Sequence, residues 1–294
     1  MLTERFSPRF VDLDAWPTGE MIAAMYEGQL FAAAAVKEAL GAIAKAVDAA
    51  VPALRRGGRL VYVGAGTSGR IGVQDGTELP PTYGWPADRL IFAMAGGLGA
   101  LVQSVEGAED SASAGAQAMA DAGVNADDVV IGLAASGTTP YTIGALKGAG
   151  EVGALTIAIA SNPEAPLFDV ARHKILVETG PEVIAGSTRM KAGTAQKIVL
   201  NLLSTAVMVR LGRVYRGLMV HMRASNEKLK RRAERMVHEI VGCSADEAAR
   251  LVERANGDVK TAVLLGFGLE PAEAADVLAR HQGNLRSAIG EIAR

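Results

Sequence analysis

The sequence predicts an α/β fold, with a doubly wound, five-stranded parallel sheet covered by helices on both faces and a small all-helical module at the C-terminus. Five short apolar runs alternate with helical segments, as expected for parallel strands that are buried on both faces. The last part of the chain contains no strand candidate. With 294 residues, 49% of them hydrophobic, the chain is long enough for one α/β domain and a small appendage.

The elements are expected in a regular order. Residues 19–54 are alanine-rich with helical spacing and end before Gly57-Gly58. The apolar stretch 198–209 is interrupted by polar residues and is too short to span a bilayer, so it predicts a buried helix. We divide the chain into an N-terminal helical segment (1–45), a sheet domain (46–225) and a helical module (226–294). The predicted strands are residues 59–63, 90–95, 128–134, 154–160 and 174–178.

The C-terminal module carries an internal repeat with an offset of 26 residues. Each unit predicts a pair of short helices, joined at Asn256-Gly257 in the first unit and at Gln282-Gly283 in the second. A charged helix over 226–240 precedes them, and we expect a role in interaction or subunit packing. The repeat matches Glu247 with Glu273, Arg254 with Arg280, Gly257 with Gly283, and Ala262 with Ala288.

Composition and charge argue against several classes of protein. The 30 Lys and Arg residues are balanced by 32 Asp and Glu residues without a basic stripe, so we expect no nucleic-acid partner. The first residues contain no basic region followed by an apolar core, so we expect a cytoplasmic protein with no membrane association. The four histidines lack metal-ligand spacing, and the single Cys243 has no histidine beside it in sequence. We therefore expect no metal site, no thiolate nucleophile and no internal disulfide.

A glycine-rich loop, residues 64–70, follows the first predicted strand. Its candidate binding residues are Gly66, Thr67, Ser68 and Gly69. Glycines let the backbone approach an anion, and the N–H groups at the start of a following helix carry partial positive charge. The same glycines fit a dinucleotide motif, but the next strand does not end in the acidic residue that would hold a ribose. The loop therefore predicts a site for a phosphorylated ligand.

Further hydroxyl-rich segments follow other predicted strands, at the edge where ligands bind in parallel sheets. One follows the strand at 128–134, another is Ser161-Asn162, and a third, 186–194, precedes the long helix. Ser and Thr are also common helix N-caps, which is the simpler interpretation of any one segment. Together the segments predict a binding edge to which the candidate contributors are Ser136, Gly137, Thr139, Ser187 and Lys191.

Glu78 is a candidate for acid–base chemistry. It stands just before Pro80-Pro81, and a turn braced by prolines fixes the position of what precedes it. We therefore expect Glu78 to be held near the phosphate loop. A solvated glutamate in a turn is the alternative interpretation.

A second candidate is the acidic cluster of Glu106, Glu109 and Asp110. Crowded carboxylates shift one another's protonation, which suits general acid–base catalysis near neutral pH. The alternative for Asp110 is that it caps a helix that starts at Ser111.

Long segments of the chain match the motifs of one known family. They are residues 59–70, 75–84, 105–111, 134–137, 139–141, 186–197 and 225–229, together with the helical C-terminal module. On these segments the chain resembles the N-acetylmuramic acid 6-phosphate etherases over nearly its whole length. The resemblance implies a sugar-isomerase (SIS) fold, a homodimer, and no cofactor, whether metal or nucleotide. It also implies cleavage of the lactyl ether of N-acetylmuramic acid 6-phosphate to N-acetylglucosamine 6-phosphate and D-lactate, in bacterial cell-wall sugar recycling.

The resemblance further implies residue roles. Glu78 matches the family's proton donor, and Glu109 its second catalytic acid/base. In the implied mechanism, the open-chain aldehyde acidifies the C2 proton, Glu109 removes that proton, Glu78 protonates the lactate leaving C3, and water adds at C3. One carboxyl group must begin protonated and the other ionised, which burial and mutual repulsion would arrange. The residues expected to anchor the phosphate are Thr67, Ser68, Ser136 and Thr139.

Several positions depart from the family's pattern. Leu98 stands where the family usually has Glu, and Thr138 where it has Arg. The family's N-terminal Asn is replaced by Phe6 or Ser7, and its Ile-Asn-x-Glu-Asp stretch by residues 25–29. The changes at 98 and 138 are consistent with a compensated pair, with a different phosphorylated amino sugar, or with a weak enzyme.

Two alternative functions stay open at this stage. One is a non-catalytic regulator that binds a sugar phosphate, because the vertebrate glucokinase regulatory protein shares the fold. The presence of both Glu78 and Glu109 favours an enzyme over a regulator. The other is an isomerase of the same fold acting on a related phosphorylated amino sugar, which would release no lactate.

Overall fold

The computed structural model describes residues 1–222 and 226–293, which group into two compact units. The first unit comprises Met1–Thr77 and Ala87–Thr205, and the second comprises Glu78–Pro86 and Ala206–Arg294. These limits differ from the predicted domain division, because the short segment at Glu78–Pro86 groups with the C-terminal part. The helix α1 (Thr18–Arg55) also runs without a break across the predicted boundary at 45/46. The three-part division stays a prediction.

A five-stranded sheet forms the centre of the first unit. All neighbouring strands pair in parallel, in the order β2-β1-β3-β4-β5, so the predicted fold class is confirmed. Apolar residues on the central strands, such as Val61, Ile131 and Ile157, are fully buried because helices cover both faces. The strands are β1 (Leu60–Gly64), β2 (Leu90–Met94), β3 (Val129–Leu133), β4 (Leu155–Ala160) and β5 (His173–Leu176).

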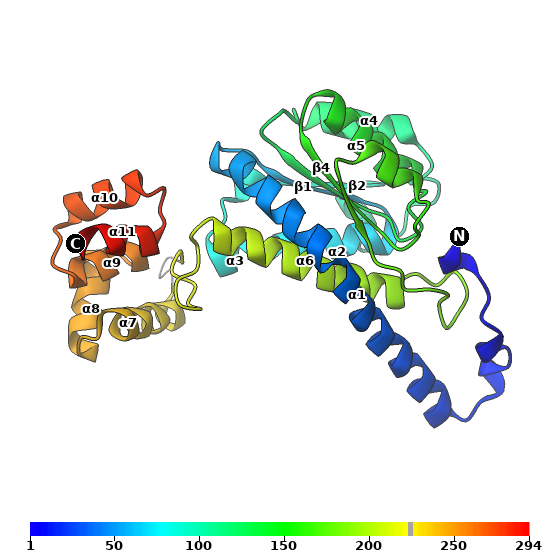
Figure 1. Cartoon of the computed structure of the whole chain (residues 1–294), viewed down its shortest axis with the longest axis horizontal. Helices are drawn as coiled ribbons and strands as arrows, with labels where there is room; N and C mark the ends of the chain where they lie inside the picture. Colours follow the sequence, from blue (N-terminus) through cyan, green and yellow to red (C-terminus); the bar gives the residue numbers. More distant parts are fainter. Residues whose placement is uncertain (223–225, 294) are drawn as a thin grey trace. The chain divides into compact units, whose positions relative to one another are not determined.

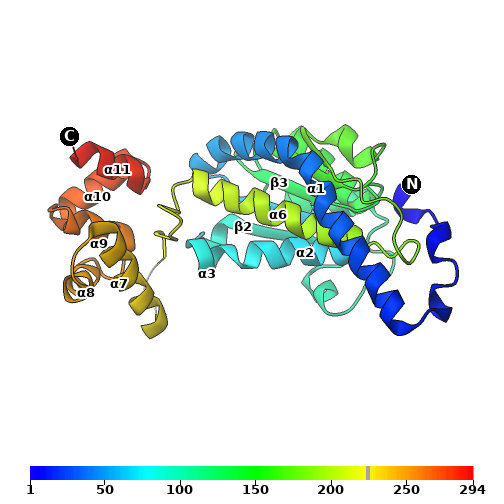
Figure 2. The ribbon, with the colours of Figure 1, turned by 60° about the horizontal axis from the view of Figure 1, so that its bottom comes forward.

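The helices of the first unit form two layers (Figures 1 and 2). On one face of the sheet lie α1, α2 (Gly66–Thr77) and α6 (Lys191–Arg210), and on the other lie α4 (Ala112–Asp121) and α5 (Pro140–Glu151). The first half of α1 extends past the sheet (Figure 1). Short 3-10 helices complete the chain at Leu2–Glu4, Pro8–Phe10, Leu13–Ala15, Ala87–Arg89, Leu98–Leu101 and Pro166–Val170.

The helices α4 and α5 pack with their backbones in contact. A Cβ atom at Gly115 would lie 1.9 Å from the carbonyl oxygen of Tyr141, and one at Gly144 would lie 1.9 Å from that of Ala112. No side chain fits at either position, so glycine is required for this close approach. The pair positions the first turn of α5 beside the end of β3.

The long helix α6 has the length and composition of a membrane span, and 56% of its most apolar window is buried inside the protein. Val199, Leu200 and Leu203 have no exposed surface. This agrees with the buried helix predicted from the apolar stretch 198–209.

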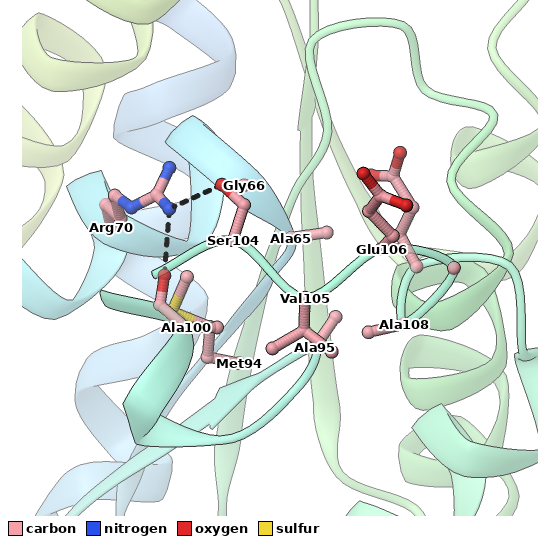
Figure 3. A pocket seen from close by; sticks show the side chains of 12 residues that line it. Ala65, Gly66, Arg70, Met94, Ala95, Ala100, Ser104, Val105, Glu106 and Ala108 are labelled. Atoms are coloured by element: carbon pink, nitrogen blue, oxygen red, sulfur yellow. Dashed lines mark hydrogen bonds between the residues drawn. The ribbon is translucent and has the colours of Figure 1, made fainter. Parts of the chain in front are cut away.

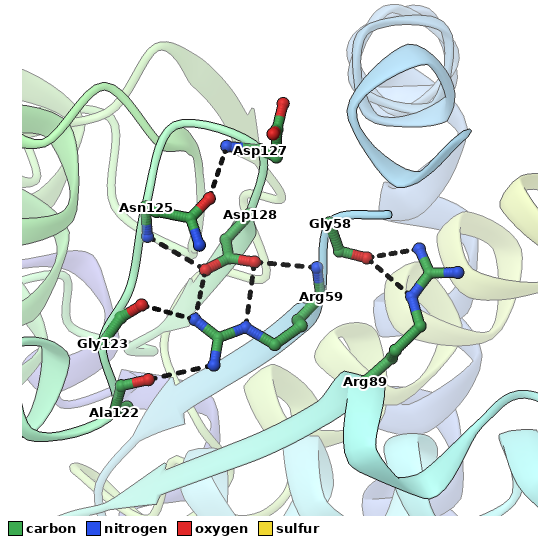
Figure 4. Close-up of polar contacts among 8 residues, drawn as sticks. All are labelled: Gly58, Arg59, Arg89, Ala122, Gly123, Asn125, Asp127 and Asp128. Atoms are coloured by element: carbon green, nitrogen blue, oxygen red, sulfur yellow. Dashed lines mark hydrogen bonds and ion pairs between the residues drawn. The ribbon is translucent and has the colours of Figure 1, made fainter. Parts of the chain in front are cut away.

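A polar network closes the amino ends of β1 and β3 (Figure 4). The Arg59 side chain donates to both carboxylate oxygens of Asp128, at 3.1 Å from Nε and 2.6 Å from Nη2, and also to the carbonyl oxygens of Ala122 and Gly123. The backbone N–H groups of Arg59 and Asn125 donate to the same carboxylate. Burial alone would raise the pKa of Asp128, but these hydrogen bonds and the guanidinium charge lower it below its ordinary value.

The second unit contains the predicted repeat. Its helices α8 and α9 recur as α10 and α11, and the N-cap residues of corresponding helices stand 26 positions apart, Ser244 with Glu270 and Asp258 with Asn284. The turn residues Asn256 and Gln282 share a positive φ, 50° and 52°. The unit's helices are α3 (Leu79–Tyr83), α7 (Glu227–Val241), α8 (Ala245–Arg254), α9 (Val259–Gly266), α10 (Pro271–Arg280) and α11 (Leu285–Ile292).

Candidate functional site

A cavity of about 350 Å³ opens at the carboxyl ends of β1 and β3. The strand β1 lies between β2 and β3 in the sheet. The chain leaves β1 toward β2 and leaves β3 toward β4, so the loops that follow β1 and β3 run in opposite directions. Such a switch in strand order leaves a crevice in which ligands bind. The described residues that line the cavity are Glu4, Ala65, Gly66, Thr67, Ser68, Glu109, Asp110, Ala135, Ser136, Thr138, Thr139, Pro140 and Thr188.

The glycine-rich loop forms one wall of this first cavity. Gly64 and Gly69 pack directly against each other, because a Cβ on Gly69 would lie 2.8 Å from the Gly64 carbonyl oxygen. Gly66 has a φ of +51° and open space where its Cβ would be, which leaves the backbone accessible at the start of α2. The loop therefore presents Thr67, Ser68 and the N-terminus of α2 to the cavity, as the sequence predicts for an anion site.

The loop after β3 forms the opposite wall. Gly137 has a φ of +74°, and its Cβ would lie 2.2 Å from that of Ala165, so this glycine shapes the loop and does not line the cavity. Ser136 Oγ accepts hydrogen bonds from the backbone N–H and the hydroxyl of Thr138, at 3.2 and 3.1 Å. Thr139 is the N-cap residue of α5, but its side chain makes no capping hydrogen bond. Its hydroxyl is therefore not committed to the helix.

Glu109 lines this cavity and also a second one of about 340 Å³. The two cavities share Ala65, Gly66 and Glu109. The Glu109 backbone carbonyl accepts the N–H of Tyr141 at 2.9 Å, which ties this residue to the first turn of α5. The predicted acid–base residue thus stands where the two cavities join, and its side chain is exposed.

The second cavity carries both signs of charge. Arg70 donates to the carbonyl oxygens of Ala100 and Leu101 and to Ser104 Oγ, and so fixes the segment after β2 that leads to the acidic cluster. Figure 3 shows Arg70 and Glu106 on opposite sides of the cavity. Ser111 is the N-cap of α4, accepting the N–H of Ala114 at 3.1 Å, so the alternative that Asp110 caps this helix is wrong.

Glu78 stands at the other end of α2 from the phosphate loop. It is the N-cap residue of α3, with an exposed side chain that makes no capping hydrogen bond. Its neighbour Thr77 ends α2, and the 1.5 Å rise per residue puts about 16 Å of helix between Gly66 and Thr77. Within one chain, α2 therefore separates Glu78 from the loop, contrary to the expectation that the Pro-Pro turn holds it close. Its catalytic role stays a prediction.

Ser187 and Lys191 are not among the described residues that line either cavity. Lys191 is buried, and its Nζ donates to the Thr179 carbonyl oxygen at 2.6 Å and lies 5.4 Å from the centre of the Phe31 ring. Burial lowers the pKa of Lys191, and the nearby Glu182 carboxylate opposes that shift. These contacts support the fold around α6, and the predicted part of Ser187 and Lys191 in binding stays a prediction.

Sequence reasoning missed three features of this region. Glu182, fully buried, accepts the backbone N–H groups of Lys191 and Ala192 and so caps α6. Asn162 binds the backbone of Leu2 through its Oδ1 at 2.7 Å and that of Ser136 through its Nδ2 at 3.0 Å, which fastens the N-terminal segment beside the cavity. Glu4 of that segment then lines the cavity. The Ser161-Asn162 pair was identified from the sequence as part of the binding edge, but the sequence does not reveal that Asn162 binds the N-terminal segment.

The two departures from the family's pattern lie in different places. Thr138 lines the first cavity and bonds to Ser136, whereas Leu98 begins a 3-10 helix and is 58% exposed without lining either cavity. Thr138 is therefore the departure that lies at the candidate site. Among the described residues, no group of three or more His, Cys, Asp and Glu side chains is arranged to hold a metal ion.

Two family models match parts of the chain. A family model described as the glucokinase regulatory protein N-terminal SIS domain matches residues 42–150, and a model of the SIS domain matches residues 104–206. Among solved structures, a phosphoheptose isomerase from Francisella tularensis aligns with a TM-score of 0.48 at 20% identity, over 66% of this chain and 98% of that chain.

Curated relatives match nearly the whole chain. An N-acetylmuramic acid 6-phosphate etherase from Deinococcus radiodurans is 50% identical over 290 residues, 98% of this chain and 95% of the relative. One from Salmonella typhimurium is 48% identical, covering 98% of each chain. The resemblance stated from the sequence motifs is therefore confirmed, and the chain belongs to the family of N-acetylmuramic acid 6-phosphate etherases.

Proposed function

We propose that the protein is a carbon–oxygen lyase that cleaves the D-lactyl ether of N-acetylmuramic acid 6-phosphate and releases N-acetylglucosamine 6-phosphate and D-lactate. The observation that carries the proposal is the position of Glu109 in the wall of both cavities. A ligand that extends from one cavity into the other passes its middle carbons along this carboxylate. The substrate has that layout, with a phosphate at C6 and the lactyl group at C3.

The first cavity takes the phosphate. Its described lining contains no Lys or Arg, and its donors are hydroxyl groups and the N–H groups at the start of helix α2. Helix N-termini bind phosphate through these N–H groups and the helix dipole. We assign Thr67, Ser68, Ser136 and Thr139 to the phosphate, which provides binding energy at a distance from the reacting carbons.

The chemistry then takes place beside Glu109. In the open-chain sugar, the C1 aldehyde makes the C2 proton acidic, and the Glu109 carboxylate accepts that proton. The electron pair of the C2–H bond forms the C2–C3 double bond as the C3–O bond breaks, and the lactate oxygen takes a proton from Glu78. Water adds to the double bond, with its oxygen at C3 and a proton at C2, and gives the product. Such general acid–base steps each contribute about 10²- to 10⁴-fold to the rate.

Both proposed catalytic carboxylates are exposed in the single chain. Keeping one protonated and the other ionised requires exclusion of water, so we infer that substrate and a second copy of the chain cover them. We accordingly propose a homodimer, located in the cytoplasm.

The test is D-lactate release from N-acetylmuramic acid 6-phosphate by the wild type and by Glu109→Gln and Glu78→Gln. We expect lactate from the wild type and a loss of at least about 100-fold in both variants. Glu106→Gln tests the neighbouring carboxylate of the second cavity. Glu164→Gln is the control that we expect to retain activity, because Glu164 is exposed and lines neither cavity.

Two results would redirect the proposal. Saturable binding of the sugar phosphate without any lactate would indicate a regulator, and conversion of the sugar without lactate would indicate an isomerase. Loss of activity in Glu106→Gln with retention in Glu109→Gln would move the base to the other carboxylate.

A further inference from the structure

A buried amide lies behind the phosphate loop. Gln196, on α6, is only 1% exposed, and its Oε1 lies 3.0 Å from Ser68 Oγ. Ser68 in turn lines the first cavity. In this orientation Gln196 Nε2 has no hydrogen-bond partner among the described residues, although it is buried. A buried donor without an acceptor is rare in folded proteins, because it loses its hydrogen bond to water and gains none in return.

With the Gln196 amide oxygen facing Ser68, the Ser68 hydroxyl has no proton left for an anion. A serine hydroxyl has one proton. If Ser68 donates it to Gln196 Oε1, the hydroxyl turns only lone pairs toward the cavity and repels a phosphate oxygen. Ser68 then cannot serve as a phosphate donor.

Exchanging the nitrogen and oxygen of the Gln196 amide resolves both problems. The two ends of an amide have nearly the same shape, so a half-turn brings Nε2 to the position 3.0 Å from Ser68 Oγ. Nε2 then donates to Ser68, the buried donor gains an acceptor, and the hydroxyl proton is free to point into the cavity. The amide oxygen left behind is an unpaired acceptor, which is better tolerated than an unpaired donor.

We propose that Gln196 is a positioning residue for phosphate binding: its amide donates to Ser68 and so directs the Ser68 hydroxyl proton toward the phosphate. This inference rests on the proposed function for the identity of the sugar, but the phosphate contact itself does not depend on catalysis. The second observation that supports it is the unpaired nitrogen of a side chain that is almost completely buried beside the cavity.

The test is a double-mutant cycle on Ser68 and Gln196, read by calorimetric binding of inorganic phosphate and, separately, by KM and kcat for lactate release. Gln196→Glu keeps the shape of the side chain, but an ionised carboxylate can only accept the Ser68 proton. We therefore expect phosphate binding to weaken and KM to rise, each by about 10- to 100-fold, while kcat changes much less. Gln196→Met removes both the donor and the acceptor and frees Ser68 to rotate, so we expect a loss of only about 5-fold.

The Ser68→Ala background separates positioning from other effects. There the Gln196→Glu change should alter phosphate binding by less than about twofold, because no hydroxyl is left to orient. An equal loss in both backgrounds would indicate charge repulsion or altered packing and would overturn the proposal, as would unchanged binding in Gln196→Glu. If Gln196→Glu does not fold, the same cycle with Gln196→Met gives the coupling. Phosphate binding is measured without turnover, so an absence of lactate would count against the proposed reaction and leave this inference standing.

Discussion

The buried carboxylate of Glu182 accepts the backbone N–H of Lys191, with a distance of 2.9 Å between Oε2 and the nitrogen. Its other oxygen accepts the N–H of Ala192 at 3.0 Å. The first N–H groups of α6 are thus satisfied from within the protein, whereas the start of α2 lines the first cavity.

We expect Glu182→Gln to destabilise the protein by about 2 kcal/mol, because one of the two N–H groups at the start of α6 loses its acceptor inside the protein. Urea unfolding followed by circular dichroism measures the change. Glu164→Gln is the control, since Glu164 is exposed. An effect of Glu182→Gln no larger than that of the control would show that the cap does not stabilise α6.

Asp128→Asn should cost about 3 kcal/mol at neutral pH, because it leaves the Arg59 guanidinium without its charged partner. The pKa of Asp128 is lower in the folded protein than in the unfolded chain. Asp128 therefore stabilises the fold fully at pH values above its pKa in the unfolded chain, and this contribution is lost as the pH falls through its pKa in the folded protein. The difference between wild type and variant should therefore shrink in acid.

Unfolding free energies at pH 7 and near pH 3 check this prediction. Asp127→Asn provides the comparison, because its ion pair with Arg56 is solvent-exposed and should contribute less than about 1 kcal/mol. A difference between wild type and Asp128→Asn that is independent of pH would contradict the proposed linkage.

We expect Lys260 to increase the free energy of unfolding as the pH rises above about 8. It is 3% exposed, its Nζ donates to the Gly283 carbonyl oxygen at 2.5 Å, and burial lowers its pKa from 10.5 to about 8. Between those values the unfolded chain binds more protons than the folded one, so the free energy of unfolding increases with pH over this window.

The measurement compares wild type with Lys260→Met at pH 7.5 and pH 9.5, by urea unfolding of the full chain. The wild type should gain stability relative to the variant, whereas Lys230→Met, which removes an exposed lysine, should follow the wild type. If the free energy of unfolding changes with pH by the same amount in wild type and Lys260→Met, Lys260 keeps its ordinary pKa.

Mixing Glu78→Gln with Glu109→Gln should restore lactate release. The two residues belong to different compact units, and α2 lies between Glu78 and the phosphate loop. We therefore expect the carboxylates of one reaction site to come from two copies. A statistical mixture of subunits in a two-fold dimer then regains about a quarter of the wild-type activity.

Co-expression or unfolding and refolding of the two variants together provides the mixture, and each variant refolded alone is the control. No gain over the separate variants, with mixed dimers demonstrated by tagged chains, would mean that one chain supplies both groups.

The sequence was informative where structure depends on local pattern. The strands were predicted from apolar runs, because strands buried on both faces consist of consecutive apolar residues. The turns at Asn256 and Gln282 were predicted from the repeat, because a glycine follows each of them at the same position of the unit. The glycine-rich loop and Ser136 were identified because both follow strands directly.

Contacts between distant segments were not visible in this way. Gln196 meets Ser68 across 128 positions, and Glu182 caps a helix that starts nine residues later after an irregular turn. Neither carries a periodic or spacing signal. The sequence does not reveal how far Glu78 lies from the phosphate loop of its own chain, because the prolines that follow it fix only a local turn, whereas the length of α2 sets that distance.

The Arg59–Asp128 network and the two cavities lie at opposite ends of β1 and β3. The strands between them are five residues long, roughly 16 Å, so a change at one end has little means of reaching the other. A substitution in the loops beyond Gly64 and Leu133 therefore alters the lining of the cavities while the polar network at the far end still holds the two strands together. Thr138 lies in one of these loops, so its effect is confined to the cavity that it lines.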